Sequence, residues 1–138
     1  MQKDCVFCRI VKGEIPSAKV FETKNVLAFL DIAPAARGHA LVIPKKHFET
    51  LLDIPAGELR ETIVAVKQVA RAVMAASDAD GFNIIQSNKK AAGQVIPHLH
   101  FHIVPRKQDD ALTFEWARIE LDKEELEILK KKVKSHLK

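Results

Sequence analysis

The sequence has little of what marks a secreted, membrane-spanning or fibrous protein. It contains only two cysteines among 138 residues, too few for the disulfide framework of a small secreted domain. No apolar stretch approaches the roughly 20 residues that a membrane-spanning helix needs, and no repeat or low-complexity segment occurs. The segment Met1 to Cys5 has no apolar signal-peptide core. We therefore expect one soluble domain over 1–138, located in the cytoplasm.

The composition that is present is ordinary for a globular protein, with 47% hydrophobic and 29% charged residues. The net charge is +4 and the pI about 9.1. A lysine-rich C-terminus supplies part of this charge, and it is typical of the solvated face of a terminal helix rather than of a nucleic-acid patch. We predict no membrane partner and no specific nucleic-acid partner.

Hydrophobic periodicity predicts an α+β domain. Apolar β-formers predict strands at 18–23, 26–30, 39–43, 82–86 and 99–104. Helices are predicted at 5–12, at 57–76 and from about Asp122 onward, where Glu125 completes a capping box. Short links between most strands favour antiparallel pairing. The prediction is an antiparallel sheet of about five strands with one long helix, a C-terminal helical extension at 119–138, and no assignment for 107–118.

Three histidines alternate in the segment His98-Leu-His-Phe-His102. Side chains alternate between the two faces of a strand, so His98, His100 and His102 share one face. Successive positions on that face are about 6.5 Å apart along the strand. The intervening apolar residues then point into a core. A single histidine is usually structural, but three in strict alternation favour nucleophilic, proton-transfer or metal chemistry.

This segment resembles the His-x-His-x-His motif of the histidine triad (HIT) family, in which x is apolar. The similarity extends over roughly 5–106. It includes Phe29-Leu-Asp-Ile32, Gly38-His-Ala-Leu-Val-Ile-Pro-Lys-Lys-His47 and Ala92-Gly-Gln94. The sequence is most similar to small bacterial members of the branch that acts on purine nucleoside phosphoramidates and acyl-nucleotides. The resemblance implies a hydrolase that cleaves the α-phosphate linkage of phosphoramidates, acyl-nucleotides or dinucleoside polyphosphates.

The resemblance also implies residue roles at the triad. His100 attacks the α-phosphorus and forms a nucleotidyl-histidine intermediate, following the two-step logic of covalent catalysis. His102 hydrogen-bonds the phosphate oxygens as charge develops there, and His39 orients the imidazoles. The alternative for His39 is an ordinary strand histidine.

By resemblance, the nucleoside pocket is formed by Ile15, Phe29, Leu30, Asp31 and Ile32. The Asp31 carboxylate accepts hydrogen bonds from the ribose hydroxyls, and the apolar side chains enclose a purine base. The alternative is that Phe29 and Ile32 belong only to the core.

The phosphate side of the site departs in part from the family pattern. Gly93 and Gln94 are expected to bring backbone donors to the phosphate, because glycine permits close approach. Many members have Asn eleven residues before His98, where this chain has Ser87 followed by Asn88; either residue is a candidate contact. Several relatives have Ser where this chain has Val95, so the group that protonates the leaving group stays unassigned.

Cys5 and Cys8 form a C-x-x-C pair, a spacing that suits zinc. In the bacterial members that carry this pair, zinc is also bound by residues that correspond to His47 and His98, so the resemblance implies a closed structural site of two thiolates and two imidazoles. The alternatives are free thiols or a redox pair, although no thioredoxin-like strand–helix setting follows.

Two other functions stay open at this point. The chain could be a purine-nucleotide-binding regulatory module acting through a protein partner, or a metalloenzyme whose three triad histidines hold one ion. The metalloenzyme is disfavoured, because the outer two residues lie about 13 Å apart along a strand. The family is usually dimeric, and extra apolar residues on the 57–76 helix, Val64, Val69 and Met74, could serve a two-fold interface or a wide core face.

Overall fold

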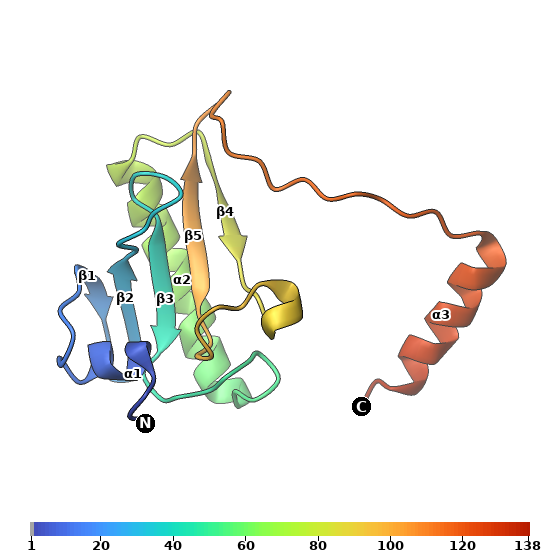
Figure 1. Ribbon diagram of the computed structural model, residues 1–138, viewed down its shortest axis with the longest axis horizontal. Helices are drawn as coiled ribbons and strands as arrows, with labels where there is room; N and C mark the ends of the chain where they lie inside the picture. The colour runs from blue at the N-terminus through green and yellow to red at the C-terminus, as the bar shows by residue number, and fades with distance from the viewer. Residues whose placement is uncertain (1) are drawn as a thin grey trace.

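The computed structural model describes residues 2–138. Five strands form one sheet in the order β1-β2-β3-β5-β4, and all neighbours are antiparallel (Figure 1). The strands are β1 (Lys19–Glu22), β2 (Val26–Leu30), β3 (Ala40–Pro44), β4 (Gly81–Ile85) and β5 (Phe101–Arg106). The helices are α1 (Val6–Val11), α2 (Ala56–Ala76), the short 3-10 helix η1 (Lys90–Ala92) and α3 (Lys123–Ser135). The α+β architecture predicted from the sequence is confirmed.

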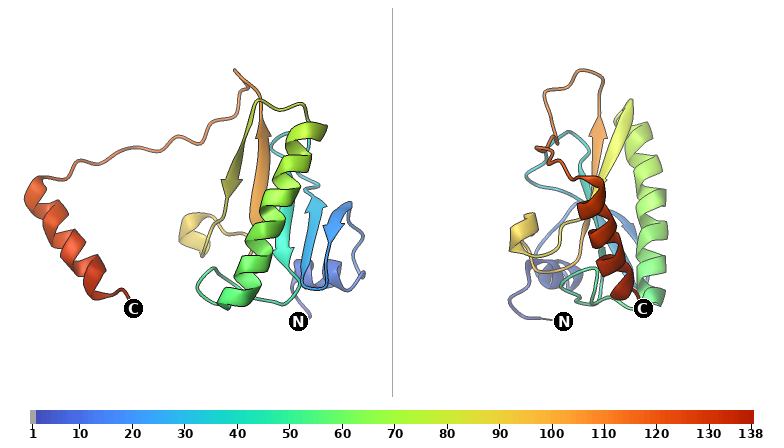
Figure 2. Two further views of the ribbon diagram at one scale, coloured as in Figure 1. Left: turned by 180° about the vertical axis from the view of Figure 1, so that it is seen from behind. Right: turned by 90° about the vertical axis from the view of Figure 1, so that its right-hand side faces the viewer.

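The two faces of the sheet carry two separate apolar clusters. On one face, Val66, Val69 and Val73 of α2 pack against Val42 and Ile103, and Figure 2 shows α2 lying along this face. On the other face, α1 packs on the sheet through a second cluster. That cluster includes Phe7, Ile10, Leu27, Phe29, Leu41 and Ile43. Successive residues of β2 and β3 alternate between the two clusters, so both strands are apolar throughout.

The segment that precedes β3 turns sharply at Gly38, whose φ is +95°. A Cβ there would lie 2.3 Å from Ser77 Oγ, so both the backbone conformation and the space require glycine. This turn returns the chain to the sheet at the end of the 31–38 loop, so that His39 lies beside Asp31.

The C-terminal region differs from the rest of the chain. After β5, residues 107–122 form an irregular arm, which explains why the sequence shows no periodicity at 107–118. The capping box of Asp122 and Glu125 is present at the start of α3. All α3 residues are exposed, and α3 stands apart from the sheet in Figure 1 and in the left-hand view of Figure 2.

Within residues 2–138, none of the helices is long and apolar enough to cross a membrane.

Candidate functional site

The three triad histidines lie on the face of the sheet that α1 covers. Leu99, Phe101 and Ile103 point to the opposite face and join the α2 cluster, so the predicted alternation holds. The His100 and His102 rings are 4.9 Å apart between centroids. The three histidines nevertheless have different surroundings, because His98 turns toward α1.

His98 belongs to a cluster of four possible metal ligands, with Cys5, Cys8 and His47. The His98 Nδ1 atom lies 3.3 Å from Cys5 Sγ and 3.6 Å from Cys8 Sγ. Cys8 Sγ lies 3.4 Å from His47 Nδ1. Ligand atoms placed 2.0–2.3 Å from one ion at tetrahedral angles would be roughly 3.5 Å apart. The four side chains therefore have the composition and spacing of a closed metal site.

The protonation of His98 agrees with this arrangement. Its Nε2–H donates to the Pro44 carbonyl at 2.9 Å, so the Nδ1 lone pair faces the two thiols. Burial lowers the pKa of His98 to about 4, and burial raises the pKa of the Cys5 thiol. A neutral imidazole is the form that binds metal, and a cation nearby would favour the thiolates.

His100 presents a free ring nitrogen. Its Nδ1–H donates to the backbone carbonyl of His98 at 2.7 Å, which leaves the Nε2 lone pair unprotonated. The ring is 8% exposed and meets the edge of Phe7 at 5.1 Å between centroids. Burial lowers the pKa of His100, so the neutral form prevails near pH 7.

A chain of hydrogen bonds fixes the tautomers of His39 and His102. The Ala35 N–H donates to His39 Nδ1 at 3.0 Å. His39 therefore carries its proton on Nε2, which lies 2.9 Å from His102 Nδ1 and donates to it. His102 in turn carries its proton on Nε2. Burial lowers the pKa of His102 to about 4, and burial also lowers the pKa of His39.

Asp31 joins this histidine pair. Its Oδ2 is 3.6 Å from His39 Nε2, and its Oδ1 accepts a hydrogen bond from the Ala33 N–H at 2.9 Å. Asp31, His39 and His102 thus form the second described group whose ligand atoms lie within 4.8 Å of one another. Because His39 and His102 already share a hydrogen bond, their nitrogens face each other rather than a common ion.

The apolar residues predicted for the nucleoside pocket divide between the two faces. Phe29 packs edge-on against Phe7 at 5.5 Å between centroids, and Ile15 borders the same cluster. The Ile32 side chain is 95% exposed at the surface. Leu30 points to the α2 face, where it lines a groove, so the structure does not bring its side chain to the histidines.

The side chains of the 86–94 loop are largely occupied by its own folding. Asn88 Oδ1 accepts hydrogen bonds from Leu51 N at 2.8 Å and from Gln86 Nε2 at 2.9 Å. Gln94 accepts from Lys89 N and donates to the Glu49 carbonyl, both at 2.7 Å.

The backbone of this loop is also hydrogen-bonded within the loop. The Ser87 carbonyl accepts from Gln86 Nε2 at 3.2 Å. Gly93 has a φ of +89°, and a Cβ built there would meet nothing within 4 Å. Val95 is 89% exposed. The structure therefore does not support the prediction of free backbone donors here, because the Gly93 N–H donates to the Lys90 carbonyl at 2.9 Å and the Gln94 N–H to the Lys89 carbonyl at 3.1 Å.

Sequence reasoning missed two contributors to the site. Phe7 packs against His98 and His100, at 5.8 and 5.1 Å between centroids, and the Ala35 N–H sets the His39 tautomer. The position of Phe7 between two candidate ligand cysteines was an available signal. No sequence signal points to Ala35, because its role comes only from backbone geometry.

The antiparallel α+β domain and the alternating histidines beside a C-x-x-C pair define a histidine triad protein. A model of the HIT domain matches residues 12–109, and the chain belongs to the HIT family. The adenosine 5'-monophosphoramidase of Saccharomyces cerevisiae is 42% identical over 134 residues, which cover 96% of this chain and 82% of that protein. An adenylylsulfatase of Arabidopsis thaliana is 41% identical over 128 residues, 93% of this chain and 64% of that protein.

A crystal structure of a HIT family member from Bacillus subtilis matches with a TM-score of 0.93 and 36% identity, and the match covers 99% of each chain. The family predicted from the sequence is therefore confirmed.

Proposed function

We propose that the protein hydrolyses the α-phosphate linkage of purine nucleotide derivatives through a nucleotidyl-histidine intermediate on His100. The observation that carries the proposal is the hydrogen bond from His100 Nδ1–H to the His98 carbonyl. It leaves a neutral, buried imidazole with its Nε2 lone pair free to attack.

In the first step, the Nε2 lone pair forms a bond to the α-phosphorus. The bond to the leaving group breaks, its electron pair departs with that group, and the group takes up a proton from the solvent. In the second step, water attacks the same phosphorus and gives up a proton to the solvent, and the phosphorus–nitrogen bond breaks. A nucleoside monophosphate is released and His100 returns to its neutral form. Phosphorus–nitrogen and phosphorus–oxygen bonds are both within reach of this chemistry, so the substrates include nucleoside phosphoramidates, acyl-nucleotides and dinucleoside polyphosphates.

His102 supplies a hydrogen-bond donor for the phosphate oxygens. His39 holds the proton of His102 on Nε2, so that donor is available throughout the reaction. His39 is a positioning residue, since it acts through His102. Ser87, Asn88, Gly93 and Gln94 border the phosphate side of the site. The N–H groups of Gly93 and Gln94 already donate to the Lys90 and Lys89 carbonyls, so we assign no phosphate donor to them.

Asp31 binds the ribose hydroxyls through its carboxylate. The base lies against Ile15, Phe29 and Ile32, and contact with a base would explain why a residue as apolar as Ile32 is 95% exposed. Leu30 contributes its backbone position rather than its side chain.

We also propose that Cys5, Cys8, His47 and His98 bind a structural zinc ion. The support is the two-thiol, two-imidazole donor set and its near-tetrahedral spacing. The ion would fix His98, whose carbonyl orients His100. Both thiols are free, and thiols persist in a reducing compartment such as the cytoplasm, where we place the protein.

The protein is further proposed to be a homodimer that pairs through α2 and β4. The outer edge of β4 is unpaired in the described sheet, and an exposed edge strand favours pairing with another chain. Ile63 and Met74 of α2 line an apolar depression together with Phe82 and Ile84 of β4. The latter two side chains are 44% and 40% exposed.

A regulatory nucleotide-binding module remains the second candidate, because the same pocket serves binding without turnover. The test compares His100→Ala with His136→Ala, a substitution of an exposed histidine in the C-terminal segment. We expect His100→Ala to lose nearly all hydrolysis of adenosine phosphoramidate while its affinity for the nucleoside monophosphate stays within a few-fold of wild type. His136→Ala should match wild type in both. Equal turnover in all three proteins would overturn the role of His100, and nucleotide binding without turnover in wild type would favour the binding module.

A further inference from the structure

The C-terminal helix lacks a surface to pack on within its own chain. All residues of α3 are exposed, yet the helix carries an apolar stripe at helical spacing. Leu126, Leu129 and Val133 are 58%, 44% and 59% exposed, and Leu137 follows at 72%. A helix of 13 residues is marginal in water without tertiary packing. The stripe therefore needs an apolar partner.

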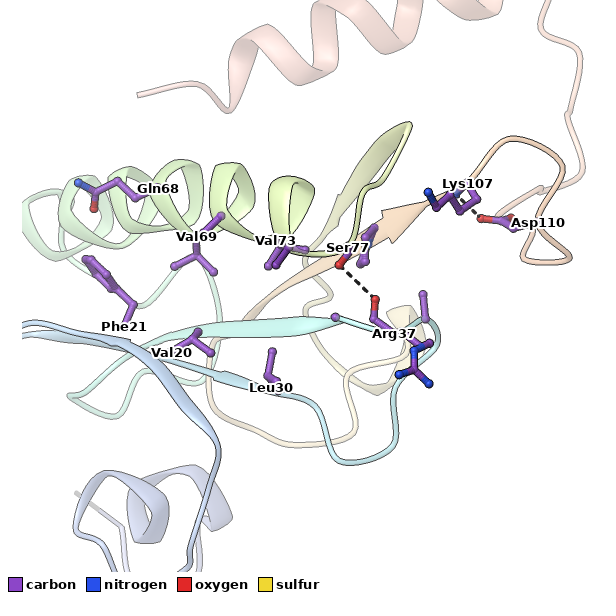
Figure 3. A pocket seen from close by; sticks show the side chains of 15 residues that line it. Val20, Phe21, Leu30, Arg37, Gln68, Val69, Val73, Ser77, Lys107 and Asp110 are labelled. Atoms are coloured by element: carbon purple, nitrogen blue, oxygen red, sulfur yellow. Dashed lines mark hydrogen bonds between the residues drawn. The ribbon is translucent and has the colours of Figure 1, made fainter.

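An apolar groove of matching character lies on the α2 face of the sheet. It has a volume of about 710 Å³ and runs between α2 and the first two strands. Figure 3 shows Val69 and Val73 of α2 facing Val20, Phe21 and Leu30 across it. The groove exists because α2 packs mainly on β3 and β5, so β1 and the end of β2 are left without a covering helix. Val20 is 50% exposed and Leu30 36% exposed as a result.

We propose that α3 of one copy docks its apolar stripe into this groove of a second copy, and that the exchange is reciprocal. This inference rests on the proposed pairing of two copies through β4 and α2. In the dimer, α3 of each subunit would pack beside α2 of the other subunit, on the same face of the sheet.

The course of the arm supports exchange between subunits. Arg106 binds the Asp110 carboxylate at 2.6 and 2.8 Å and lies over the Phe114 ring. These contacts fix the first part of the arm. From there it runs past β4, away from β1, and α3 lies on the far side of β4 (Figure 1). A second copy paired along β4 would occupy this side.

The arm is also long enough. The ten residues 113–122 span at most about 35 Å when extended. A sheet of five strands is roughly 20 Å wide at about 4.8 Å per strand. The arm can therefore cross the sheet of a partner and deliver α3 to that partner's β1 edge. In the edge-on view, α3 lies at a depth between the sheet and α2 (Figure 2, right), which is the depth of the groove.

The match to the relative from Bacillus subtilis indicates that its chain has the same extended placement. The arm and α3 make up about a fifth of the chain. If this fifth lay elsewhere in the relative, the TM-score could not reach 0.93 over 99% of both chains. An arm held in one extended position without support from its own body requires support from another molecule.

Docking would connect the groove to the nucleotide site. Leu30, Ala36, Arg37 and Gly38 line the groove, and they flank the loop that carries Asp31. The docked helix of the partner would therefore brace the segment that we propose binds the ribose.

Disulfide trapping in the full-length protein tests the exchange. Leu129→Cys is combined in turn with Ala72→Cys and with Val20→Cys, on opposite walls of the groove. We expect at least one pair to give a covalent dimer on a non-reducing gel. Leu129→Cys alone and Lys131→Cys with Ala72→Cys, on the polar side of α3, serve as controls and should give none above background.

The outcomes separate the two proposals. A protein that sediments as a dimer but forms no cross-link, or forms only an intramolecular one, overturns the exchange while the dimer stands. A monomer in sedimentation overturns the dimer and the exchange together. As a second readout, Leu129→Asp should raise the dimer dissociation constant at least about tenfold, because it places a charge in an apolar groove. Lys131→Asp should leave the constant within about twofold, and equal effects of the two variants would contradict the docking.

Discussion

Loss of the proposed zinc ion should destabilise the protein far more than the loss of a surface histidine. His47→Ala removes a half-buried side chain whose Nδ1 faces Cys8 Sγ. His136→Ala makes the same chemical change at an exposed position at the end of α3. The two variants differ in one respect that matters here, which is contact with the four-ligand cluster.

The expected magnitude follows from linkage between binding and folding. A ligand present at a thousand times its dissociation constant stabilises the native state by about 4 kcal/mol. For a chain of this size, each kcal/mol corresponds to roughly 3–5 °C in Tm. We therefore expect His47→Ala or chelator treatment to lower the Tm by roughly 12–20 °C. His136→Ala should change it by no more than about 2 °C.

The structure also indicates which part of the molecule responds. Cys5 caps the N-terminus of α1 and Cys8 lies in its first turn, and Phe7 from this helix packs on Phe29 and His100. Without the ion, two buried thiols and His98 lose their common partner, and α1 loosens from the sheet. Thermal unfolding followed by circular dichroism, paired with metal analysis by mass spectrometry, provides the assay. A wild-type protein that contains no zinc, or that melts at the same temperature with and without chelator, would refute this reasoning.

Three further predictions concern the ribose, the histidine network and the subunit interface. Asp31→Asn should weaken ribonucleotide binding about tenfold or more in calorimetry, as expected for a charge-assisted hydrogen bond of roughly 1.5–3 kcal/mol. The affinity for 2′,3′-dideoxy analogues should not change. Equal losses for both ligands would mean that Asp31 does not contact the ribose hydroxyls. Because the pKa of His102 is about 4 in the fold and about 6.5 when unfolded, the unfolded state binds more protons between these values, so stability falls as pH drops through this window. The slope of the unfolding free energy against pH is at most about 1.4 kcal/mol per pH unit, and less for a ring that is only partly buried. Denaturant titrations at several pH values should show a shallower slope for His102→Gln than for wild type. An unchanged slope would count against a neutral His102 ring in the fold. Ile84→Glu should give a monomer in sedimentation at micromolar concentration while the exposed control Lys24→Glu stays dimeric; a wild-type monomer would remove the dimer.

The local sequence pattern is sufficient to predict the positions of most helices and strands. β2 and β3 are continuous apolar runs, and α2 shows a clear helical period, so their positions agree with the sequence prediction within one or two residues. β5 begins at Phe101 rather than at residue 99. The reason is nonlocal, because Leu99 N donates to the Phe48 carbonyl at 2.7 Å instead of joining the sheet ladder.

The candidate site is predictable where the pattern itself carries the chemistry. The alternation of the triad is enough to predict that His98, His100 and His102 point to the same side, although only His102 lies within β5. It does not reveal that His98 turns toward the cysteines; that assignment rests on the family resemblance. The same alternation could have shown that Leu30 faces away from Phe29 and Asp31, and therefore away from the histidines.

Other features depend on contacts that no local pattern encodes. The amide of Asn88 is held by Leu51, which lies 37 positions away in the chain, and so it is tied to a loop rather than free for a ligand. The segment 107–118, for which the sequence predicts no element, is an arm without secondary structure, whose apolar residues have no period because they follow no helix or strand. The surface that we propose for the following helix, α3, belongs to a second copy of the chain.

The central claim is that His100 becomes covalently attached to the nucleotide during turnover. The direct measurement is mass spectrometry of wild-type protein quenched in base during hydrolysis of adenosine phosphoramidate, with peptide mapping. We expect an adenylyl group on the peptide that contains His100, stable in base and labile in acid, and absent from His100→Ala under the same conditions. An unmodified peptide in wild type, together with normal turnover by His100→Ala, would contradict it.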